Sequence, residues 1–175
     1  MKLTHLLVAA AILLPLSQPV SAKPKKVAKH GDWYVFCDRK KAECSLAQSV
    51  QTWSKRKIEI SGFPIEPVAG NKAVAGFTIS FPKDVFLGSG FTIAIDERND
   101  RKYNYSMCNR SGCFAQIGLT KQVLAQYRGG VSAQIYYRMS SNRGNRYVAQ
   151  FSLKGFSSAI EDVASRQEEL SARRK

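Results

Sequence analysis

The chain has 175 residues, with 27 Lys and Arg against 13 Asp and Glu, and its formal net charge is +14. This length allows one domain or at most two small ones. A hydrophobic fraction of 44% is too high for a disordered chain, and 12 Gly with 6 Pro exclude collagen. The positive charge favours anionic partners such as nucleic acid, lipid head groups or acidic sugars, but it does not indicate a fold.

The first 22 residues have the three parts of a secretory signal peptide. Lys2 forms a basic n-region, Leu6–Leu16 is an apolar run, and Val20-Ser21-Ala22 offers small residues to a signal peptidase. The run is shorter than the roughly 20 apolar residues of a membrane-spanning helix. We therefore expect cleavage after Ala22 and an exported protein, periplasmic, envelope-associated or secreted, with no transmembrane span.

Basic residues are unevenly distributed along the rest of the chain. Residues 23–30 contain four Lys and no acid, and we expect a flexible basic arm there. Residues 31–100 balance nine basic against nine acidic residues. Residues 101–160 contain no carboxylate and nine basic residues, namely Arg101, Lys102, Arg110, Lys121, Arg128, Arg138, Arg143, Arg146 and Lys154. A solvated surface explains such a distribution most simply, but a block of this length also keeps a polyanion-binding surface open.

Short segments in which apolar and polar residues alternate predict antiparallel strands with one buried face. The predicted strands cover residues 32–37, 57–61, 73–81, 90–96, 102–107, 131–139 and 145–153. In the last two, Tyr137 and Tyr147 belong to the inward set, so Tyr136, Arg138 and Arg146 are expected on the outer face. The spacing of the strands indicates an all-β, two-sheet sandwich over residues 31–160.

Two short helices interrupt this pattern. Residues 120–128 end at Gly129-Gly130, which favours a helix stop. Ser158 and Glu161 have the spacing of a capping box, and apolar residues follow at helical spacing, which predicts a C-terminal helix from Ser158 to about Ser171. Residues 161–175 are thus expected to be a C-terminal helix and tail.

Four cysteines form two close pairs in the sequence. In an exported chain an even number of Cys indicates disulfides, and four Cys allow three connectivities. We favour Cys37 with Cys44 and Cys108 with Cys113, because each close pair can span a hairpin. A zinc site would need four converging thiolates, and neither spacing is typical of a zinc finger.

Motifs that would indicate catalysis are missing from the sequence. Once the signal peptide is removed, His30 is the only histidine, and it lies at the edge of the expected arm. The G-x-S-x-G, P-loop, H-E-x-x-H and G-x-G-x-x-G patterns are absent. We therefore expect a protein that is not an enzyme and has no catalytic residue, no cofactor and no metal.

Several ordered motifs carry a family resemblance. They are Gly31-Asp32-Trp33-Tyr34-Val35-x-Cys37, Cys44-x-Leu46-x-Gln48, Phe91–Asp96, Cys108-x-x-x-Gly112-Cys113-x-Ala115 and Ser152-Leu153-Lys154-Gly155-Phe156-x-x-Ala159. In this order they resemble the invasion-associated locus B family of exported bacterial proteins. The resemblance implies an immunoglobulin-like β-sandwich, a cell-envelope or secreted location, and a role in the entry of a bacterium into host cells. It implies no catalytic residue and no cofactor.

Two hypotheses for function follow. The first is a non-catalytic envelope protein that contributes to host-cell association or envelope function through an unknown protein or an anionic surface partner. The second is a module that binds glycosaminoglycan, lipopolysaccharide or nucleic acid, because adjacent Arg and aromatic side chains can hold phosphate or sulfate. Its candidate residues are Arg101, Lys102, Tyr136, Arg138, Arg143 and Arg146. Alternatively, the same Arg residues only keep a sheet edge soluble.

Overall fold

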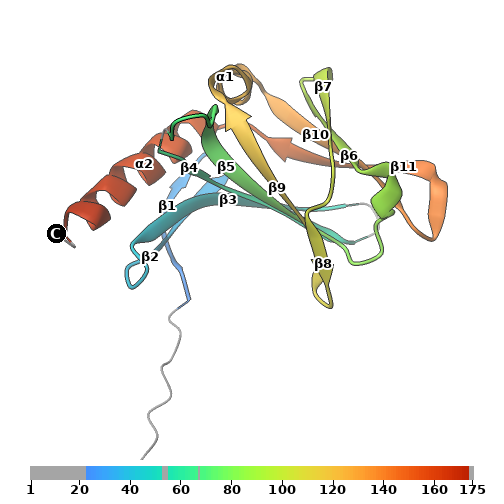
Figure 1. The fold of residues 1–175 in the computed structure, drawn as a ribbon, viewed down its shortest axis with the longest axis horizontal. Helices are drawn as coiled ribbons and strands as arrows, with labels where there is room; N and C mark the ends of the chain where they lie inside the picture. The colour runs from blue at the N-terminus through green and yellow to red at the C-terminus, as the bar shows by residue number, and fades with distance from the viewer. Residues whose placement is uncertain (1–22, 53–54, 67, 174–175) are drawn as a thin grey trace, which may run out of the picture.

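The structure, a computed structural model, describes residues 23–52, 55–66 and 68–173, so the predicted signal peptide lies outside the described residues. Two antiparallel sheets pack face to face, and a C-terminal helix lies against the larger sheet (Figure 1). The expected all-β sandwich with a C-terminal helix is confirmed.

Sheet A has seven strands in the order β1-β2-β3-β4-β5-β9-β8, and sheet B has four in the order β11-β10-β6-β7. The strands of sheet A are β1 (Lys25–His30), β2 (Trp33–Asp38), β3 (Glu43–Gln51), β4 (Lys57–Pro64), β5 (Ala73–Phe81), β8 (Met107–Asn109) and β9 (Gly112–Thr120). Those of sheet B are β6 (Phe91–Ile95), β7 (Arg98–Tyr103), β10 (Ser132–Met139) and β11 (Asn142–Ser152). The helices are η1 (Leu87–Ser89), α1 (Lys121–Gly129) and α2 (Phe156–Ala172).

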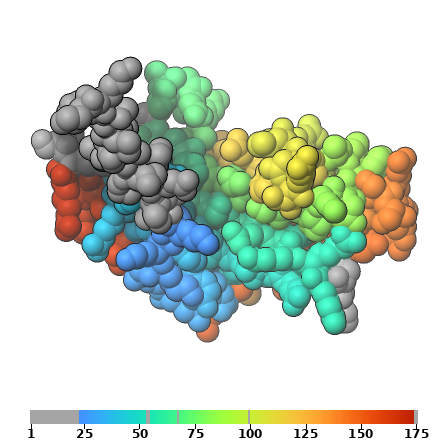
Figure 2. All heavy atoms as spheres, turned by 90° about the horizontal axis from the view of Figure 1, so that it is seen from below, coloured from blue at the N-terminus to red at the C-terminus, as the bar shows by residue number. Residues whose placement is uncertain are grey.

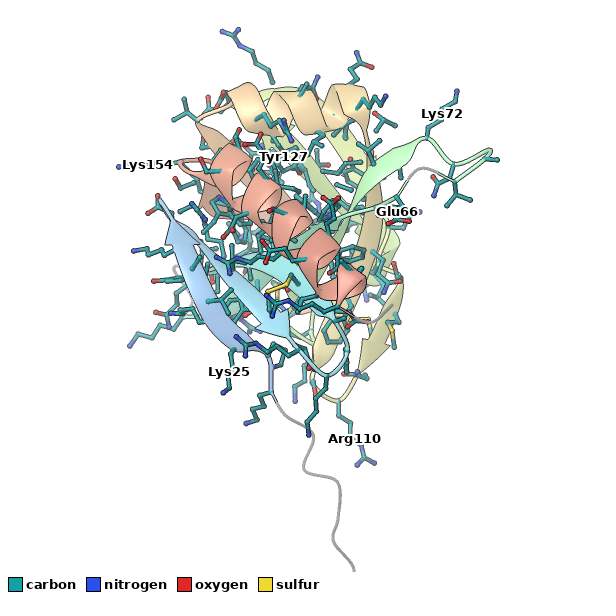
Figure 3. The ribbon with its side chains drawn as sticks, turned by 90° about the vertical axis from the view of Figure 1, so that its left-hand side faces the viewer. Lys25, Glu66, Lys72, Arg110, Tyr127 and Lys154 are labelled. Atoms are coloured by element: carbon teal, nitrogen blue, oxygen red, sulfur yellow. A yellow bond between two sulfur atoms is a disulfide. The ribbon has the colours of Figure 1, made fainter. Side chains whose placement is uncertain are left out.

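One face of sheet A is buried across β2, β3, β4, β5 and β9, whereas the outermost strands β1 and β8 have no fully buried residue. Residues of β5 contact both the helices and sheet B. Phe77 packs edge-on against Tyr127 of α1 and Phe156 of α2, and Phe81 packs against Phe91 of sheet B. The two helices therefore cover one part of this face and sheet B covers the other. Figure 3 shows Tyr127 between α1 and α2. A strand whose alternate residues are apolar can fill such a core from one side only.

The expectation of a flexible arm at residues 23–30 is wrong for Lys25–His30. This segment is strand β1, which pairs antiparallel with β2 from Lys25 opposite Cys37 to His30 opposite Trp33. The Lys26 ammonium lies 3.7 Å from the centre of the Tyr34 ring. Contact with an aromatic ring favours a lysine on the strand, so the high Lys content that indicated disorder is compatible with a sheet edge.

Several predicted elements begin or end at other residues, and two of them differ in more than length. The predicted strand 102–107 is divided, because β7 ends in sheet B at Tyr103 and the chain then crosses to sheet A, where β8 begins at Met107. Helix α2 begins at Phe156 after Gly155, whose φ of 84° is left-handed, and Ser158 lies inside the helix instead of capping it. Helix α2 thus runs without a break across the expected boundary between residues 160 and 161.

Helix α1 agrees with its prediction. It begins after Thr120, whose side chain accepts a hydrogen bond from the backbone N–H of Val123. Neither α1, α2 nor any other helix in the described part of the chain is long and apolar enough to cross a membrane.

Candidate functional site

The outer face of sheet B brings together most of the residues predicted to bind polyanions. The strand register places Val148, Tyr136, Thr92 and Lys102 in one row across β11, β10, β6 and β7. Tyr137, the next residue along β10, is buried in the core. Because side chains alternate between the two faces of a strand, the row faces away from sheet A.

Three arginines are held in place around two aromatic rings at the β10–β11 turn. The guanidinium carbon of Arg146 lies 3.9 Å from the centre of the Tyr136 ring, and that of Arg143 lies 4.6 Å from the centre of the Phe86 ring. Arg138 lies two residues after Tyr136 on β10, and its Nη1 donates to the carbonyl oxygens of Arg143 and Gly144 at 2.7 Å each. Stacking and backbone hydrogen bonds restrict the conformations of these guanidinium groups. We call Lys102, Tyr136, Arg138, Arg143 and Arg146 the basic face.

None of the cations of the basic face is neutralised by an ion pair with a described residue. The ion pairs among the described residues are His30–Asp162, Arg56–Asp84, Lys57–Glu59, Arg128–Glu161 and Arg166–Asp162. The turn lies at the end of the molecule farthest from α2 (Figures 1 and 2). The positive charge of the basic face is therefore available to an anion from solution.

Arg101 does not belong to the basic face, although the sequence prediction included it. Arg101 stands opposite Ile93 in the β6–β7 register, and Ile93 is buried in the core. Residues opposite each other share a face, so the Arg101 side chain lies on the inner side of sheet B, near Tyr103 and Tyr127. Its Nε atom is buried without a hydrogen-bond partner among the described residues. Adjacent positions on a strand face opposite ways, which separates Arg101 from Lys102.

Phe86 is part of this arrangement and was not predicted from the sequence. It lies in the loop between β5 and β6, and its N–H donates to the carbonyl oxygen of Arg138 at 2.8 Å. Val85 forms an isolated bridge with Met139 beside it. This pairing joins residues more than 50 positions apart, so no local pattern could have placed Phe86 beneath Arg143.

Three of the five motifs that carry the family resemblance, those that begin at Gly31, Cys44 and Ser152, meet in the core at the other end of the sandwich. The buried Gln48 side chain accepts from the Ser152 N–H at 2.9 Å and donates to the carbonyl oxygens of Ser152 and Asp32 at 3.0 and 3.2 Å. The Trp33 indole also donates to Ser152, and its ring packs edge-on against Phe156. These contacts join β2 and β3 of sheet A to β11 and α2. The residues of these motifs therefore stabilise the fold.

Both cysteine pairs form disulfides within hairpins. Cys37 is joined to Cys44 across β2 and β3, and Cys108 is joined to Cys113 across β8 and β9. In each case the two residues stand directly opposite each other in the strand register. This is the pairing favoured from the sequence. No group of three or more His, Cys, Asp or Glu among the described residues is placed to hold a metal ion.

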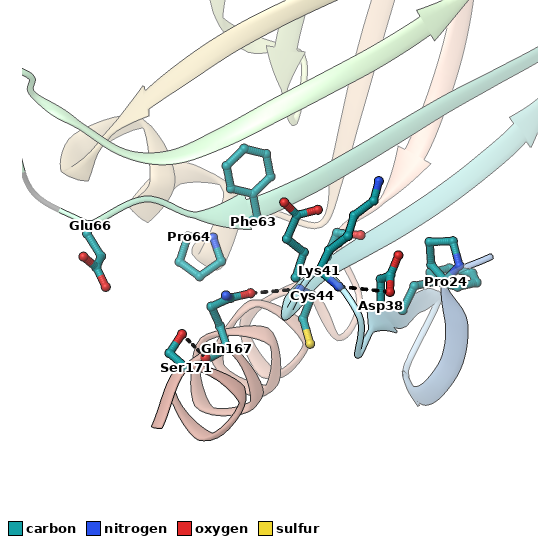
Figure 4. Close-up of a pocket in the computed structure, with 12 residues that line it drawn as sticks. Pro24, Asp38, Lys41, Cys44, Phe63, Pro64, Glu66, Gln167 and Ser171 are labelled. Atoms are coloured by element: carbon teal, nitrogen blue, oxygen red, sulfur yellow. Dashed lines mark hydrogen bonds between the residues drawn. The ribbon is translucent and has the colours of Figure 1, made fainter. Parts of the chain in front are cut away.

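A surface cavity of about 470 Å³ lies between the β2–β3 turn and the last turns of α2 (Figure 4). Phe36 and Phe63 contribute apolar walls. Two polar side chains of the wall form hydrogen bonds with the β2–β3 hairpin. Asp38 accepts hydrogen bonds from the N–H groups of two turn residues. The Gln167 side chain accepts from the Cys44 N–H and donates to the Ala42 carbonyl oxygen. These contacts attach α2 to the hairpin.

Two tyrosines, Tyr127 in the core and Tyr105 packed against it, have raised pKa values. Burial raises the pKa of Tyr105 and of Tyr127 above the ordinary value of 10.0. Both phenols therefore remain protonated at neutral pH and cannot serve as bases there.

Comparison with known proteins agrees with the resemblance noted in the sequence. The model of the family described as Invasion associated locus B (IalB) protein matches residues 33–164. The crystal structure of invasion associated protein b from Bartonella henselae superposes with a TM-score of 0.67 at 17% identity, and the match covers 84% of this chain and 99% of that one. No curated protein matches the chain. Since the family model spans most of the described domain, the chain belongs to the invasion associated locus B (IalB) family.

Proposed function

We propose that this protein is an exported, non-enzymatic protein of the bacterial envelope that contributes to host-cell association or envelope function by surface contact. Membership of the IalB family supports this role, as does the name of its structural neighbour. The two hairpin disulfides support export, because disulfides persist in oxidising compartments.

The contact surface that the geometry favours is the basic face, and its ligand is an anionic polymer. The observation that carries this proposal is the group of three restrained guanidinium groups of Arg138, Arg143 and Arg146, none of which has a carboxylate partner among the described residues. Guanidinium forks recognise sulfate, phosphate and carboxylate groups by paired hydrogen bonds. Glycosaminoglycan, lipopolysaccharide and nucleic acid all carry such groups at regular intervals.

Retention of residues 23–175 on a heparin column over a salt gradient tests the proposal. The variant Arg138→Ala/Arg146→Ala is expected to elute at lower salt than the wild type, because it removes two charges of the basic face. Lys25→Ala/Lys29→Ala is the matched control, since it removes the same charge from β1 in the other sheet. Charge-driven binding weakens as salt rises, so the salt concentration at elution measures the strength of binding, and the wild type and both variants are run on the same gradient.

Equal elution of the Arg variant and the wild type would reject the basic face. If the β1 variant alone elutes early, the lysines of β1 form the anion-binding surface. Circular dichroism of both variants shows whether each has kept the fold.

A further inference from the structure

The four outermost strands of the two sheets differ in how they are protected from pairing with another chain. Strand β1 carries Lys25, Lys26 and Lys29, and β8 has only three residues. Strand β7 is charged along most of its length, with the sequence RNDRKY. Strand β11 has 11 residues, and after Arg146 its sequence YVAQFS contains no charge. Charges and short length are the usual protection of sheet edges. The second half of β11 has neither.

Backbone groups of β11 point away from sheet B at alternate residues. Leu153, just beyond the strand, donates its N–H to Val131 of the segment that leads into β10. Ser152, one residue earlier, instead uses its N–H and C=O for Gln48 of sheet A. By this alternation the N–H and C=O groups of Val148 and Gln150 also point outward, and in the part of the chain that the structure describes β11 pairs with no strand other than β10. At Ser152 the Gln48 amide takes the place of a strand, but the edge from Arg146 to Gln150 has no such cover among the described residues.

We infer that this edge pairs with the same edge of a second copy of the chain, antiparallel about a two-fold axis at Val148. In this register Val148 stands opposite Val148 of the second copy, and Arg146 stands opposite Gln150 of the second copy. The Val148 side chain, 38% exposed, gains an apolar neighbour at the axis. Arg146 thus faces the Gln150 amide of the second copy, which can accept a hydrogen bond, and no like charges stand opposite each other. An interface that repeats itself about a two-fold axis closes as a dimer.

The pairing joins the two four-stranded sheets into one sheet of eight strands. Their outer surfaces become continuous, so the two copies present their basic faces on the same side. The buried area of such a contact is small, and both copies are positively charged, so we expect a dimer that depends on protein concentration and is favoured by salt. This inference does not depend on polyanion binding.

Cross-linking of introduced cysteines tests both the contact and its register. Directly opposite residues of a hydrogen-bonded pair have Cα atoms about 5.5 Å apart, within the range of a disulfide. Under mild oxidation Val148→Cys is expected to form a covalent dimer. A mixture of Arg146→Cys with Gln150→Cys is expected to cross-link as a mixed dimer, whereas Arg146→Cys alone is not. Val131→Cys is the matched control, because Val131 is 77% exposed and lies just before β10, away from the proposed axis at Val148.

Sedimentation equilibrium of the wild type over a concentration series gives an independent measurement. The average mass is expected to rise toward twice that of the monomer, and Val148→Lys is expected to lose this rise because it places like charges at the axis. Val131→Lys should behave as the wild type. A wild type that stays monomeric at every concentration and salt would overturn the inference. So would a Val148→Cys protein that cross-links no faster than Val131→Cys.

Discussion

Gln48 shows at the scale of a residue why a polar side chain occupies a buried position of β3, in line with the buried Cys44 and Leu46. It is 7% exposed, and it supplies both the donor and the acceptor that the Ser152 backbone lacks at the sheet edge. A buried backbone group without a partner destabilises the fold, so an amide is needed at this position. The sequence contains the motif, but it does not show that Gln48 and Ser152, 104 positions apart, are partners.

Gln48→Met is expected to destabilise the protein by about 1–3 kcal/mol, because it keeps the volume but leaves the Ser152 N–H unpaired. Urea unfolding with both disulfides intact measures the change. Gln116→Met, at an exposed position of β9, should change the free energy of unfolding by less than about 0.5 kcal/mol. Equal effects of the two substitutions would show that the Gln48 contacts contribute nothing specific.

At the scale of an element, the two disulfide hairpins differ in accessibility. Cys108 lies on the exposed strand β8, whereas Cys37, Cys44 and Cys113 are 7%, 4% and 1% exposed. Reduction requires a thiolate to reach one sulfur of the bond. We therefore expect a limiting reductant to open the Cys108–Cys113 bond first. Alkylation followed by peptide mapping measures the order, and early labelling of Cys37 or Cys44 would contradict it.

The contact between β1 and α2 gives the protein a pH-dependent element. His30 Nε2 lies 2.9 Å from Asp162 Oδ2, and Arg166 donates to the other oxygen of that carboxylate at 2.8 Å. Partial burial alone would raise the pKa of Asp162, but the hydrogen bonds from His30 and Arg166 outweigh it and hold the pKa below its ordinary value of 3.8. The ionised form of the Asp162 carboxyl group is thus more stable in the folded protein than in the unfolded chain.

Asp162→Asn is expected to lower the urea midpoint at pH 7. A group with a lowered pKa stabilises the fold above its unfolded pKa and loses this effect as pH falls through the folded pKa. The difference from the wild type should therefore shrink as pH falls below about 3.8. Glu161→Gln, at an exposed ion pair on the same helix, is the control and should change little. A difference that stays constant down to acid pH would exclude the ionised carboxylate as its cause.

At the scale of the whole molecule, α2 completes the core that sheet B leaves open. Phe156, Ala159, Ile160 and Val163 are buried, and Gln167 holds the β2–β3 turn. The sequence placed a boundary after residue 160, in the middle of this helix. The core therefore extends past that boundary.

A chain that ends at Ile160 is expected to expose apolar surface and to lose cooperative unfolding, since the face of sheet A beneath α2 is uncovered. A chain that ends at Ala172 retains the whole helix and should unfold as the wild type does. Binding of the dye ANS and urea unfolding measure the two outcomes. Cooperative unfolding of the shorter chain would show that the helix beyond residue 160 is dispensable.

Strand alternation and Cys spacing determined the sandwich class, several strands and the favoured disulfide pairing from the sequence alone, because both signals are local. Strand β5 was predicted with its observed bounds, and α1 was predicted from its stop signal. Strands β1, β3 and β9 were not predicted as strands. Lys, Ser and Gln at their outer positions weaken the alternation of apolar and polar residues on which the prediction rests.

Only the tertiary structure decided which basic residues lie together on one face. Arg101 and Lys102 are adjacent in sequence, yet the pleat places them on opposite faces. Arg143 and Phe86 are distant in sequence, yet strand pairing brings them into contact. The sequence by itself determined that the chain carries a net charge of +14 and a block of 60 residues without a carboxylate. Where that charge gathers depends on strand register and sheet order, which arise from contacts between distant segments and leave no local pattern.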